Sequence, residues 1–281
     1  MNAIPDMEGR LLLLGAGRMG TAMLRGWLAS GMPADRIVVL DPAPSEEALR
    51  LIGEAGIALN PSPEETGPAS VLVAAVKPQV MDEALSGIAP RLPGDGPPLI
   101  LSIAAGRTIA SFKRHFGGDA PVVRAMPNTP AAIGAGITGF AASPEVDEAQ
   151  KALARALLSA LGEVVEVADE SLIDAVTAVS GSGPAYVFLL AECLAEAGVR
   201  QGLPADLAAK LAQATVSGAG ALLGASGEDP AALRRAVTSP GGTTAAALEV
   251  LMDDADGLCR LMERAVAAAA RRSRELAGDG K

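Results

Sequence analysis

Glycine and hydroxyl residues gather in one stretch near the C-terminal end of the chain, Val237-Thr238-Ser239-Pro240-Gly241-Gly242-Thr243-Thr244. A helix-forming run rich in alanine follows at once, from 245 to 249. A helix that begins in such a loop leaves its first N–H groups without intrahelical partners, and its dipole adds partial positive charge there. The two glycines would let a small carboxylate reach this main chain, and Ser239, Thr243 and Thr244 would bring hydroxyl groups to the rest of the ligand. The stretch therefore predicts an anion-binding site, with an ordinary helix cap after a proline turn as the alternative.

A second glycine pattern lies near the N-terminus, Gly15-Ala16-Gly17-Arg18-Met19-Gly20. It follows a short apolar run and precedes a segment with helical spacing, which is the order of a dinucleotide-binding loop. The first glycine permits the tight turn, the second lets a pyrophosphate approach the backbone, and the third lets the helix pack on the strand. Because this order occurs early in the chain, the sequence predicts a nicotinamide dinucleotide as cofactor.

Asp41 ends the next apolar run, 21 positions after Gly20. An acidic residue there commonly binds the ribose hydroxyls of adenosine, and its charge would repel a ribose phosphate, which favours NAD. Arg18 lies inside the glycine loop, however, and an arginine could pair with such a phosphate. The sequence leaves NADPH and NADH as alternatives.

Three further loops are candidates for cofactor binding because each follows a predicted strand. Parallel sheets hold ligands at the carboxyl ends of their strands. The residues in these loops are Val76, Lys77, Pro78, Ala104, Ala105, Gly106 and Asn128. Small residues at 104–106 would let a nicotinamide ring lie close to the backbone. Lys77 is expected to lie at the cofactor, and the alternative is that it is an ordinary solvated lysine in a loop.

Apolar runs and helical spacing alternate from the N-terminus to Ala168. The expected strands cover residues 10–14, 37–40, 70–75, 99–103, 121–125 and 164–167. Helices are expected at 21–29, 80–89 and 146–161, and residues 134–139 are expected to form a glycine-rich connection. This alternation predicts an α/β N-terminal domain, residues 1–168, built on a doubly wound, Rossmann-like parallel sheet.

Beyond Ala168 only helical spacing remains, which predicts an all-α C-terminal domain, residues 169–281. Its helices are expected at 171–179, 185–198, 204–223, 231–237, 244–252 and 258–276. The helix at 183–198 is apolar around most of its surface, so we expect it to be buried on several sides. Because about a hundred residues of helix have little to enclose by themselves, we expect a subunit interface.

Composition restricts the partners of the chain. Its 281 residues carry a net charge of -10 with a pI near 4.7, which disfavours binding to nucleic acid or to an anionic membrane surface. Aromatic residues make up 2% of the chain, too few for a surface that stacks bases. The N-terminal apolar run at 11–14 is far too short for a signal peptide or a membrane span, so we expect a cytoplasmic protein.

Few other side chains offer chemistry. Cys193 and Cys259 sit in apolar helical patterns, so we expect both to be buried, reduced packing residues. His115, the sole histidine, is assigned no catalytic role. Tyr186, the sole tyrosine, is expected to pack beside a glycine turn, with a proton donor as the alternative. The sequence contains no cluster of metal ligands, so no metal site is predicted.

Taken together, these residues resemble the pyrroline-5-carboxylate reductase family, and the resemblance covers nearly the whole chain. The most specific matching segments are 174–186, with the sequence DAVTAVSGSGPAY, 239–244, with the sequence SPGGTT, 75–78, with the sequence AVKP, and 126–130, with the sequence MPNTP. The family reduces a cyclic imine to L-proline with NADPH or NADH, in the last step of proline biosynthesis. Its helical halves interlock into dimers, often five dimers in a ring, so the resemblance implies at least a homodimer.

The resemblance also implies roles for single residues. The substrate carboxylate would sit on the N–H groups around Gly242, Thr243 and Thr244, with Ser239 beside them. Thr244 matches the threonine whose hydroxyl meets the ring nitrogen, and is the expected catalytic residue, while Glu170 matches a carboxylate near the substrate. The chain departs from the family at Arg18, where asparagine is expected, and at Asp41, where a hydroxyl or basic residue is common. Both departures concern the phosphate end of the cofactor.

Two other functions fit parts of the sequence. A β-hydroxyacid dehydrogenase has a similar two-domain plan and needs a lysine on a buried helix of its second domain as acid and base, for which only Lys210 is available. A dinucleotide-binding protein without catalysis, such as a redox sensor, is the other alternative, although a sensor has no need of the stretch at 239–244.

Overall fold

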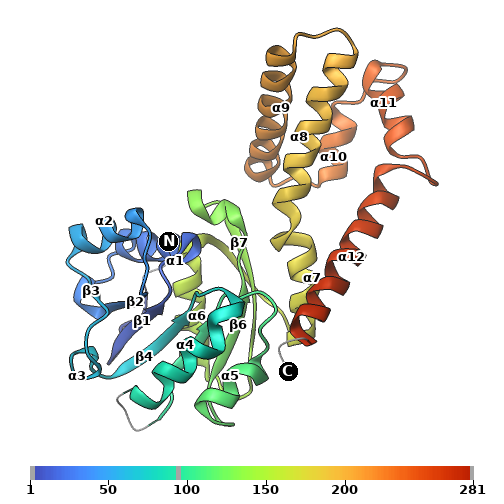
Figure 1. The fold of residues 1–281 in the computed structure, drawn as a ribbon. Helices are drawn as coiled ribbons and strands as arrows, with labels where there is room; N and C mark the ends of the chain where they lie inside the picture. The colour runs from blue at the N-terminus through green and yellow to red at the C-terminus, as the bar shows by residue number, and fades with distance from the viewer. Residues whose placement is uncertain (1–3, 93–95, 279–281) are drawn as a thin grey trace. The chain divides into compact units, whose positions relative to one another are not determined.

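The computed structural model describes residues 4–92 and 96–278 (Figure 1). The chain divides into two compact units, one containing the residues up to Gly181 together with those from Ala269, and the other containing Ser182–Ala268. Strands end before Ala168, as expected, but the first helical turns after it still belong with the sheet. The compact units therefore differ from the predicted domains 1–168 and 169–281 in the segments 169–181 and 269–281.

The described residues of the first unit form one eight-stranded sheet in the order β3-β2-β1-β4-β5-β6-β7-β8. Its strands are β1 (Arg10–Leu14), β2 (Ile37–Leu40), β3 (Ala58–Leu59), β4 (Ala69–Ala74), β5 (Leu99–Ser102), β6 (Val122–Met126), β7 (Gly136–Ala142) and β8 (Gly162–Glu166). Neighbouring strands are parallel except β6 and β7, which are antiparallel and place Ala125 opposite Phe140. The Rossmann-like parallel sheet is confirmed for β1–β6, with a reversed pair of strands added at one edge.

The strand β7 shows that the expectation of a connecting loop at 134–139 is wrong. An added Cβ at Gly136 would lie 2.7 Å from the carbonyl oxygen of Leu161, and one at Gly139 would lie 2.7 Å from Cγ1 of Val176. Glycine is needed at both positions because other parts of the chain approach the strand closely. The glycines that suggested a loop thus mark close packing within a sheet.

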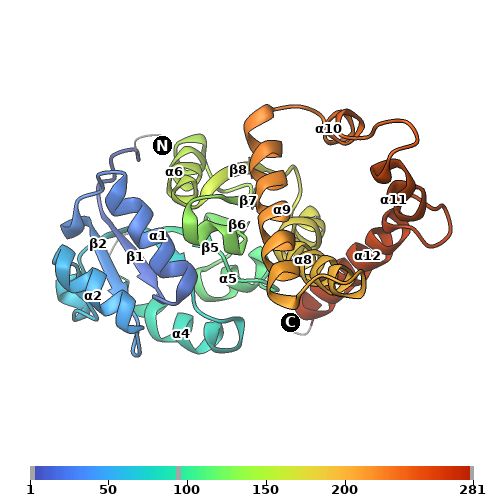
Figure 2. The same ribbon diagram turned by 90° about the horizontal axis from the view of Figure 1, so that it is seen from above.

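Both faces of the sheet are covered, which explains the continuous apolar run of β1. Leu11 and Leu13 belong to one buried cluster, while Leu12 and Leu14 belong to another. Helices α1 (Arg18–Ala29), α2 (Glu46–Ala55) and α6 (Glu148–Leu158) contribute to the first cluster, and α4 (Met81–Ile88) and α5 (Ile109–Phe116) contribute to the second. Figure 2 shows α1 and α6 on one face of the sheet and α4 and α5 on the other.

Shorter helical segments complete the first unit. The four-residue helix α3 (Pro63–Thr66) begins with a capping box made by Ser62 and Glu65. Helix α7 (Ile173–Val176) continues into a π-helical turn, Thr177–Gly181, where the unit ends. The end of the long helix α12 (Leu258–Gly278) returns to this unit from Ala269 onward.

The second unit, Ser182–Ala268, contains helices joined by loops and no strand. It contains α8 (Gly183–Arg200), α9 (Ala205–Ser226), α10 (Pro230–Ala236), α11 (Thr243–Leu251) and the first part of α12. Helices α8 and α9 pack closely where Gly198 faces Ala208, since an added Cβ at Gly198 would lie 3.3 Å from Cβ of Ala208.

Burial in the second unit differs from expectation. Helix α8 contains no buried residue in the single chain, and its side chains Phe188, Leu189 and Leu190 are 62%, 57% and 50% exposed. Cys193 and Cys259 are free and exposed, so their predicted burial is wrong for the isolated chain. The physical reason is the same for all of them, because one copy of the unit has too little mass to cover its own apolar helices.

Candidate active site

The glycine loop between β1 and α1 has the geometry of a dinucleotide seat. Gly15 has a φ of +95°, which side-chain-bearing residues rarely adopt, and an added Cβ at Gly20 would clash with the carbonyl oxygen of Gly15. By contrast, an added Cβ at Gly17 would meet no atom within 4 Å. Helix α1 has no side-chain cap at Gly17 and no acidic residue in its first turn. The open space and the uncapped helix start therefore suit a pyrophosphate.

The loops after β4 and β5 lie at the same edge of the sheet as the glycine loop. Ala75 N donates to Leu14 O at 2.8 Å, and Ile103 N donates to Ala74 O at 3.2 Å, so the three strand ends are adjacent. The backbone of Val76 approaches Gly15 so closely that an added Cβ on the glycine would lie 2.9 Å from Val76 N. Val76 and the neighbouring Lys77 and Pro78 are therefore brought to the cofactor seat, and the Lys77 side chain is exposed.

The residues predicted in the other two loops also have local packing roles. Ala104 is buried, Ala105 is exposed, and Gly106 turns with a φ of +72° against Leu276 of α12. The side-chain oxygen of Asn128 accepts a hydrogen bond from Ile137 N at 3.0 Å and fixes the start of β7. Its amide nitrogen is the group that a cofactor could use.

Asp41 lies at the carboxyl end of β2 and is bonded to the glycine loop. One carboxylate oxygen accepts from Ala16 N at 2.7 Å, and the other accepts from Ala43 N at 2.8 Å. The main chain of Asp41 donates to the side chain of Asn60 at 2.9 Å and accepts from it at 2.7 Å. The carboxylate is thus held beside the loop, where the adenosine ribose of a dinucleotide is expected.

A buried arginine that the sequence reasoning missed joins two of these loops. Arg107 follows the 104–106 turn and binds Asp82, in the first turn of α4, through both terminal nitrogens of its guanidinium, one of them at 2.9 Å. His115 Nε2 lies 3.0 Å from the same carboxylate. These hydrogen bonds, that of Arg107 first, lower the pKa of Asp82 to about 2. A charged residue directly after a turn of small residues is the pattern that could have indicated this pair.

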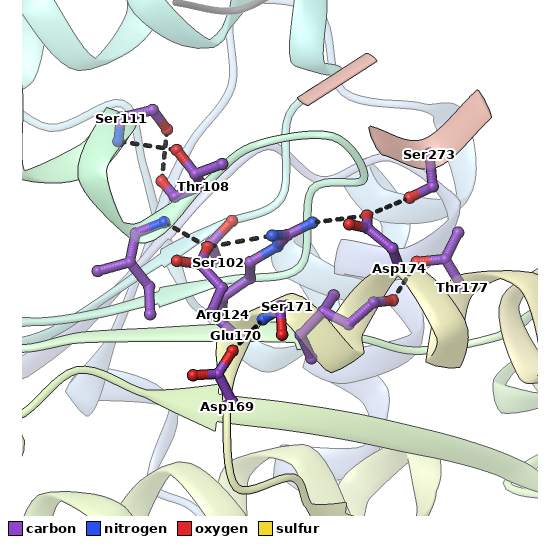
Figure 3. A network of polar contacts seen from close by, with 12 residues as sticks. Ser102, Thr108, Ser111, Arg124, Asp169, Glu170, Ser171, Asp174, Thr177 and Ser273 are labelled. Atoms are coloured by element: carbon purple, nitrogen blue, oxygen red, sulfur yellow. Dashed lines mark hydrogen bonds and ion pairs between the residues drawn. The ribbon is translucent and has the colours of Figure 1, made fainter. Parts of the chain in front are cut away.

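Figure 3 shows a second charged network, centred on Arg124 of β6. Glu170 Oε1 lies 3.0 Å from Arg124 Nη1 and accepts from Ile109 N at 2.8 Å. Asp174 lies 3.7 Å from the same guanidinium and accepts from Ser273 of α12 at 2.6 Å. The network borders a cavity of about 470 Å³. One oxygen of Glu170, the predicted substrate carboxylate, is therefore engaged in holding the start of the helical segment to the sheet.

In the second unit, the stretch at 239–244 forms a tight turn that opens α11. Gly242 N donates to Ser239 O at 3.0 Å across Pro240 and Gly241, and Gly241 has a φ of +68°, which is the pattern of a type II turn. The predicted N–H group of Gly242 is therefore already used within the turn.

The next N–H groups are placed differently. The N–H groups of Thr243 and Thr244 precede the first intrahelical bond of α11, which Ala246 donates to Gly242 at 3.2 Å. Helix α11 has no side-chain cap and no acidic residue in its first turn. Ser239 and Thr243 are exposed and Thr244 is half-buried, so all three are accessible to a small ligand.

The residue that the alternative dehydrogenase function would require is not placed as that function needs. Lys210, which a β-hydroxyacid dehydrogenase would need on a buried helix, is exposed on α9. Among residues 4–92 and 96–278, no group of three or more metal-ligating side chains is found. Within the same described ranges, one helical stretch, Glu170–Arg200, is long and apolar enough to cross a membrane by length and composition alone.

Comparison with known proteins decides the family. The chain is 43% identical to the pyrroline-5-carboxylate reductase of Pseudomonas aeruginosa over 269 residues, which cover 95% of this chain and 97% of that protein. The chain belongs to the pyrroline-5-carboxylate reductase family. The chain is also 42% identical to the pyrroline-5-carboxylate reductase of Synechocystis sp., in a match that covers 96% of this chain and 99% of that protein.

Domain families and solved structures agree with this membership. Residues 170–276 match the family described as pyrroline-5-carboxylate reductase dimerisation, and residues 10–106 match the one described as NADP oxidoreductase coenzyme F420-dependent. The structure of the Coxiella burnetii reductase is similar with a TM-score of 0.87 and 34% identity, covering 96% of this chain and 99% of that one. That of the Plasmodium falciparum reductase with NADP bound has a TM-score of 0.77 and 28% identity, covering 96% and 98%.

Proposed function

We propose that this chain reduces 1-pyrroline-5-carboxylate to L-proline by hydride transfer from NADPH or NADH, the final step of proline biosynthesis. The identity of 43% to a pyrroline-5-carboxylate reductase along nearly the full length of both chains carries this conclusion. The open space beside Gly17 also supports it, because a reductase of this kind must bind the pyrophosphate of its cofactor.

Within that reaction, the glycine loop is the pyrophosphate-binding element of our proposal. Gly15, Gly17 and Gly20 set its path, and the side chains of Arg18 and Met19 border it. The loops at 76–78 and 104–106, together with Asn128, would flank the nicotinamide end. NADPH or NADH supplies the hydride when bound, and the residues of the chain hold and orient the reactants.

The stretch at 239–244 is the substrate-binding element of our proposal. The N–H groups of Thr243 and Thr244 and the positive end of the α11 dipole would hold the substrate carboxylate, with the Ser239 hydroxyl beside it. The Thr244 hydroxyl would meet the ring nitrogen. A protonated imine is already electrophilic, so orientation and charge complementarity suffice, and no strong acid is required.

Glu170 is kept as a candidate for substrate binding with a narrower role. Its Oε1 atom is bonded to Arg124 and to Ile109 N, which leaves the Oε2 atom for a ligand. We propose that Glu170 acts mainly through the position it gives to the helical segment that follows it.

Homo-oligomerisation accounts for the exposed apolar helices. The matched dimerisation region covers all of α8 to α11 and most of α12, which includes the exposed Phe188, Leu189 and Leu190. A second copy would bury this surface, and its burial explains the apolar stretch at 170–200 without a membrane. We further propose that five dimers form a ring and that the enzyme acts in the cytoplasm.

Steady-state kinetics test the proposed function. The purified chain is expected to oxidise NADH or NADPH only when pyrroline-5-carboxylate is added, with L-proline as the product. The comparison substrate is a 3-hydroxy acid with the oxidised cofactor, for which no turnover is expected. Turnover of the hydroxy acid with none of the imine would replace this function by that of a β-hydroxyacid dehydrogenase, and binding of cofactor with neither activity would favour a sensor.

A further inference from the structure

The carboxyl end of β2 carries the features that decide which nicotinamide dinucleotide fits. We propose that Asp41 makes this chain select NADH over NADPH, by accepting hydrogen bonds from the adenosine ribose and repelling a 2′-phosphate. The inference rests on the proposed function, because it concerns the cofactor of that reaction.

The position of the Asp41 carboxylate is fixed from two sides. Its oxygens accept from Ala16 N at 2.7 Å and from Ala43 N at 2.8 Å, and the side chain of Asn60 holds its main chain through two further hydrogen bonds. Asn60 itself adopts a positive φ of 49° to make them. A carboxylate held in this way cannot turn aside to admit a second anion at the same place.

The hydrogen-bonding capacity of the carboxylate matches a ribose with free hydroxyls. Each carboxylate oxygen offers about two acceptor sites, so one site on each remains after the bonds to Ala16 and Ala43. Ribose hydroxyls can donate to these sites. A 2′-phosphate has only acceptor oxygens and carries additional negative charge at neutral pH, so it would meet the carboxylate with neither a donor nor a compatible charge.

The segment that follows Asp41 supplies no basic residue to offset this repulsion. From 41 to 49 the charged residues are Asp41, Glu46 and Glu47. Apart from Arg18, the arginines on α1 and α2 are paired: Arg25 forms an ion pair with Glu47, and Arg50 lies 4.0 Å from Glu54. A phosphate near this segment would therefore meet acidic groups and arginines that already have partners.

The two helix starts at this edge of the sheet also differ in their suitability for an anion. Helix α1 begins without a side-chain cap or an acid in its first turn. Helix α2 is capped by Ser45, which accepts from Ala48 N at 3.2 Å, and has Glu46 and Glu47 in its first turn. The N-terminus of α1 can thus bind the pyrophosphate. The N-terminus of α2 offers less to a 2′-phosphate, because Glu46 and Glu47 already offset its positive dipole end.

Arg18 is the residue that could oppose this selection. It is exposed in the glycine loop and takes part in none of the ion pairs found among the described residues. Its guanidinium is on a long side chain that would have to be ordered around a phosphate, while the carboxylate of Asp41 is already in place. We therefore expect Asp41 to dominate the preference.

Direct binding to the full-length chain tests the inference apart from catalysis. The dissociation constants of NADH and NADPH would be measured by nucleotide fluorescence, and kcat/KM would be measured with each. The unaltered chain is expected to bind NADH at least about tenfold more tightly than NADPH. A tenfold difference in affinity corresponds to about 1.4 kcal/mol, which a single repulsive contact between like charges can supply. Equal or tighter binding of NADPH overturns the inference while leaving the reductase function intact.

Substitutions assign the preference to Asp41. Asp41→Asn keeps an acceptor for Ala16 N but removes the charge, and should lower the NADH to NADPH preference about tenfold, mainly through tighter NADPH binding. Glu54→Gln, on the exposed side of α2, is the matched control and should leave the preference unchanged. If Asp41→Asn has the same preference as the unaltered chain, the assignment to Asp41 is overturned. If the unaltered chain binds neither nucleotide, both this inference and the proposed function fail.

Discussion

Arg124 Nη1, on β6, lies 3.0 Å from Oε1 of Glu170, at the start of the first helical segment after the sheet. The Arg124 side chain is 4% exposed and the Glu170 side chain is 29% exposed. A guanidinium buried to this extent needs its carboxylate partners, because an unpaired charge in the interior is costly. The pair thus anchors the segment 170–181 to the sheet unit.

Removing the charge of Glu170 should therefore destabilise the protein. We expect Glu170→Gln to lower the free energy of unfolding by roughly 1–3 kcal/mol, the usual worth of a hydrogen bond to a charged group. Urea denaturation measures this. Glu148→Gln is the matched control, since Glu148 is 89% exposed in its pair with Lys151 and should matter little. A Glu170→Gln variant of full stability that fails to turn over the imine would instead favour substrate binding by Glu170.

Acid should weaken the link between Asp82 and Arg107. The hydrogen bonds from Arg107, and then from His115, lower the pKa of Asp82 from 3.8 to about 2 in the folded protein. The folded state therefore gains stability from this carboxylate above about pH 4 and loses it as the pH falls from 3.8 towards 2. Asp82→Asn should be less stable than the unaltered chain at neutral pH, by at most about 1 kcal/mol because Asp82 is 57% exposed. Urea midpoints at several pH values should show this difference shrinking in acid, and a constant difference would contradict the assignment.

Two glycines should respond oppositely to alanine. In Gly20→Ala the new Cβ would clash with the carbonyl oxygen of Gly15, so we expect a loss of about 1–3 kcal/mol in stability and weaker dinucleotide binding. In Gly53→Ala, at an exposed position of α2, the Cβ meets nothing within 4 Å, so we expect a gain of about 0.5–1 kcal/mol and unchanged binding. Thermal unfolding and nucleotide titration measure both. Tolerance of alanine at position 20 would show that the helix does not pack tightly on the loop.

The hydroxyl of Thr244 should matter for substrate alone. We expect Thr244→Ala to lower kcat roughly tenfold, which corresponds to the loss of one hydrogen bond worth about 1.4 kcal/mol in the transition state, and to leave the cofactor dissociation constant unchanged. Thr244→Ser retains the hydroxyl and should keep most of the activity. A marked loss of cofactor affinity in Thr244→Ala would mean that this stretch does not bind the substrate.

The apolar surface of α8 should control association. Phe188 is 62% exposed in the single chain, and we expect Phe188→Glu to weaken the dimer by roughly 2 kcal/mol or more. Light scattering over a range of concentrations would show the monomer fraction rise. Leu49→Glu, at a 46% exposed position on α2, is the control and should leave the dimer unchanged. Equal effects of the two variants would place the interface elsewhere.

Local patterns in the sequence predicted most of the elements but not every contact. The glycine loop, the strands β1, β4 and β5 and the long helices follow from periodicity and turn residues, which act over a few neighbouring positions. Strand β7 was missed because its glycines are required by close contacts with Leu161 and Val176, which are distant or unmarked in the sequence. The partners of Arg107 and Arg124 were missed for the same reason, since 25 and 46 positions separate them from Asp82 and Glu170.

Burial was the property least accessible to sequence reasoning. The apolar pattern of α8 and the surroundings of Cys193 predict a buried helix. The pattern does not say whether the residues that bury it come from the same chain or from a second copy. The composition of an interface helix resembles that of a core helix, because both exclude water in the assembled protein.

The route of the chain through α12 has a consequence for biosynthesis. The polypeptide leaves the sheet unit after Gly181 and rejoins it only at Ala269, where Ser273 binds Asp174. A ribosome must therefore synthesise the chain through the second part of α12 before the sheet unit has all of its parts. Premature termination before codon 273 would leave Asp174 without the hydroxyl of Ser273, and such fragments should be readily degraded in the cell.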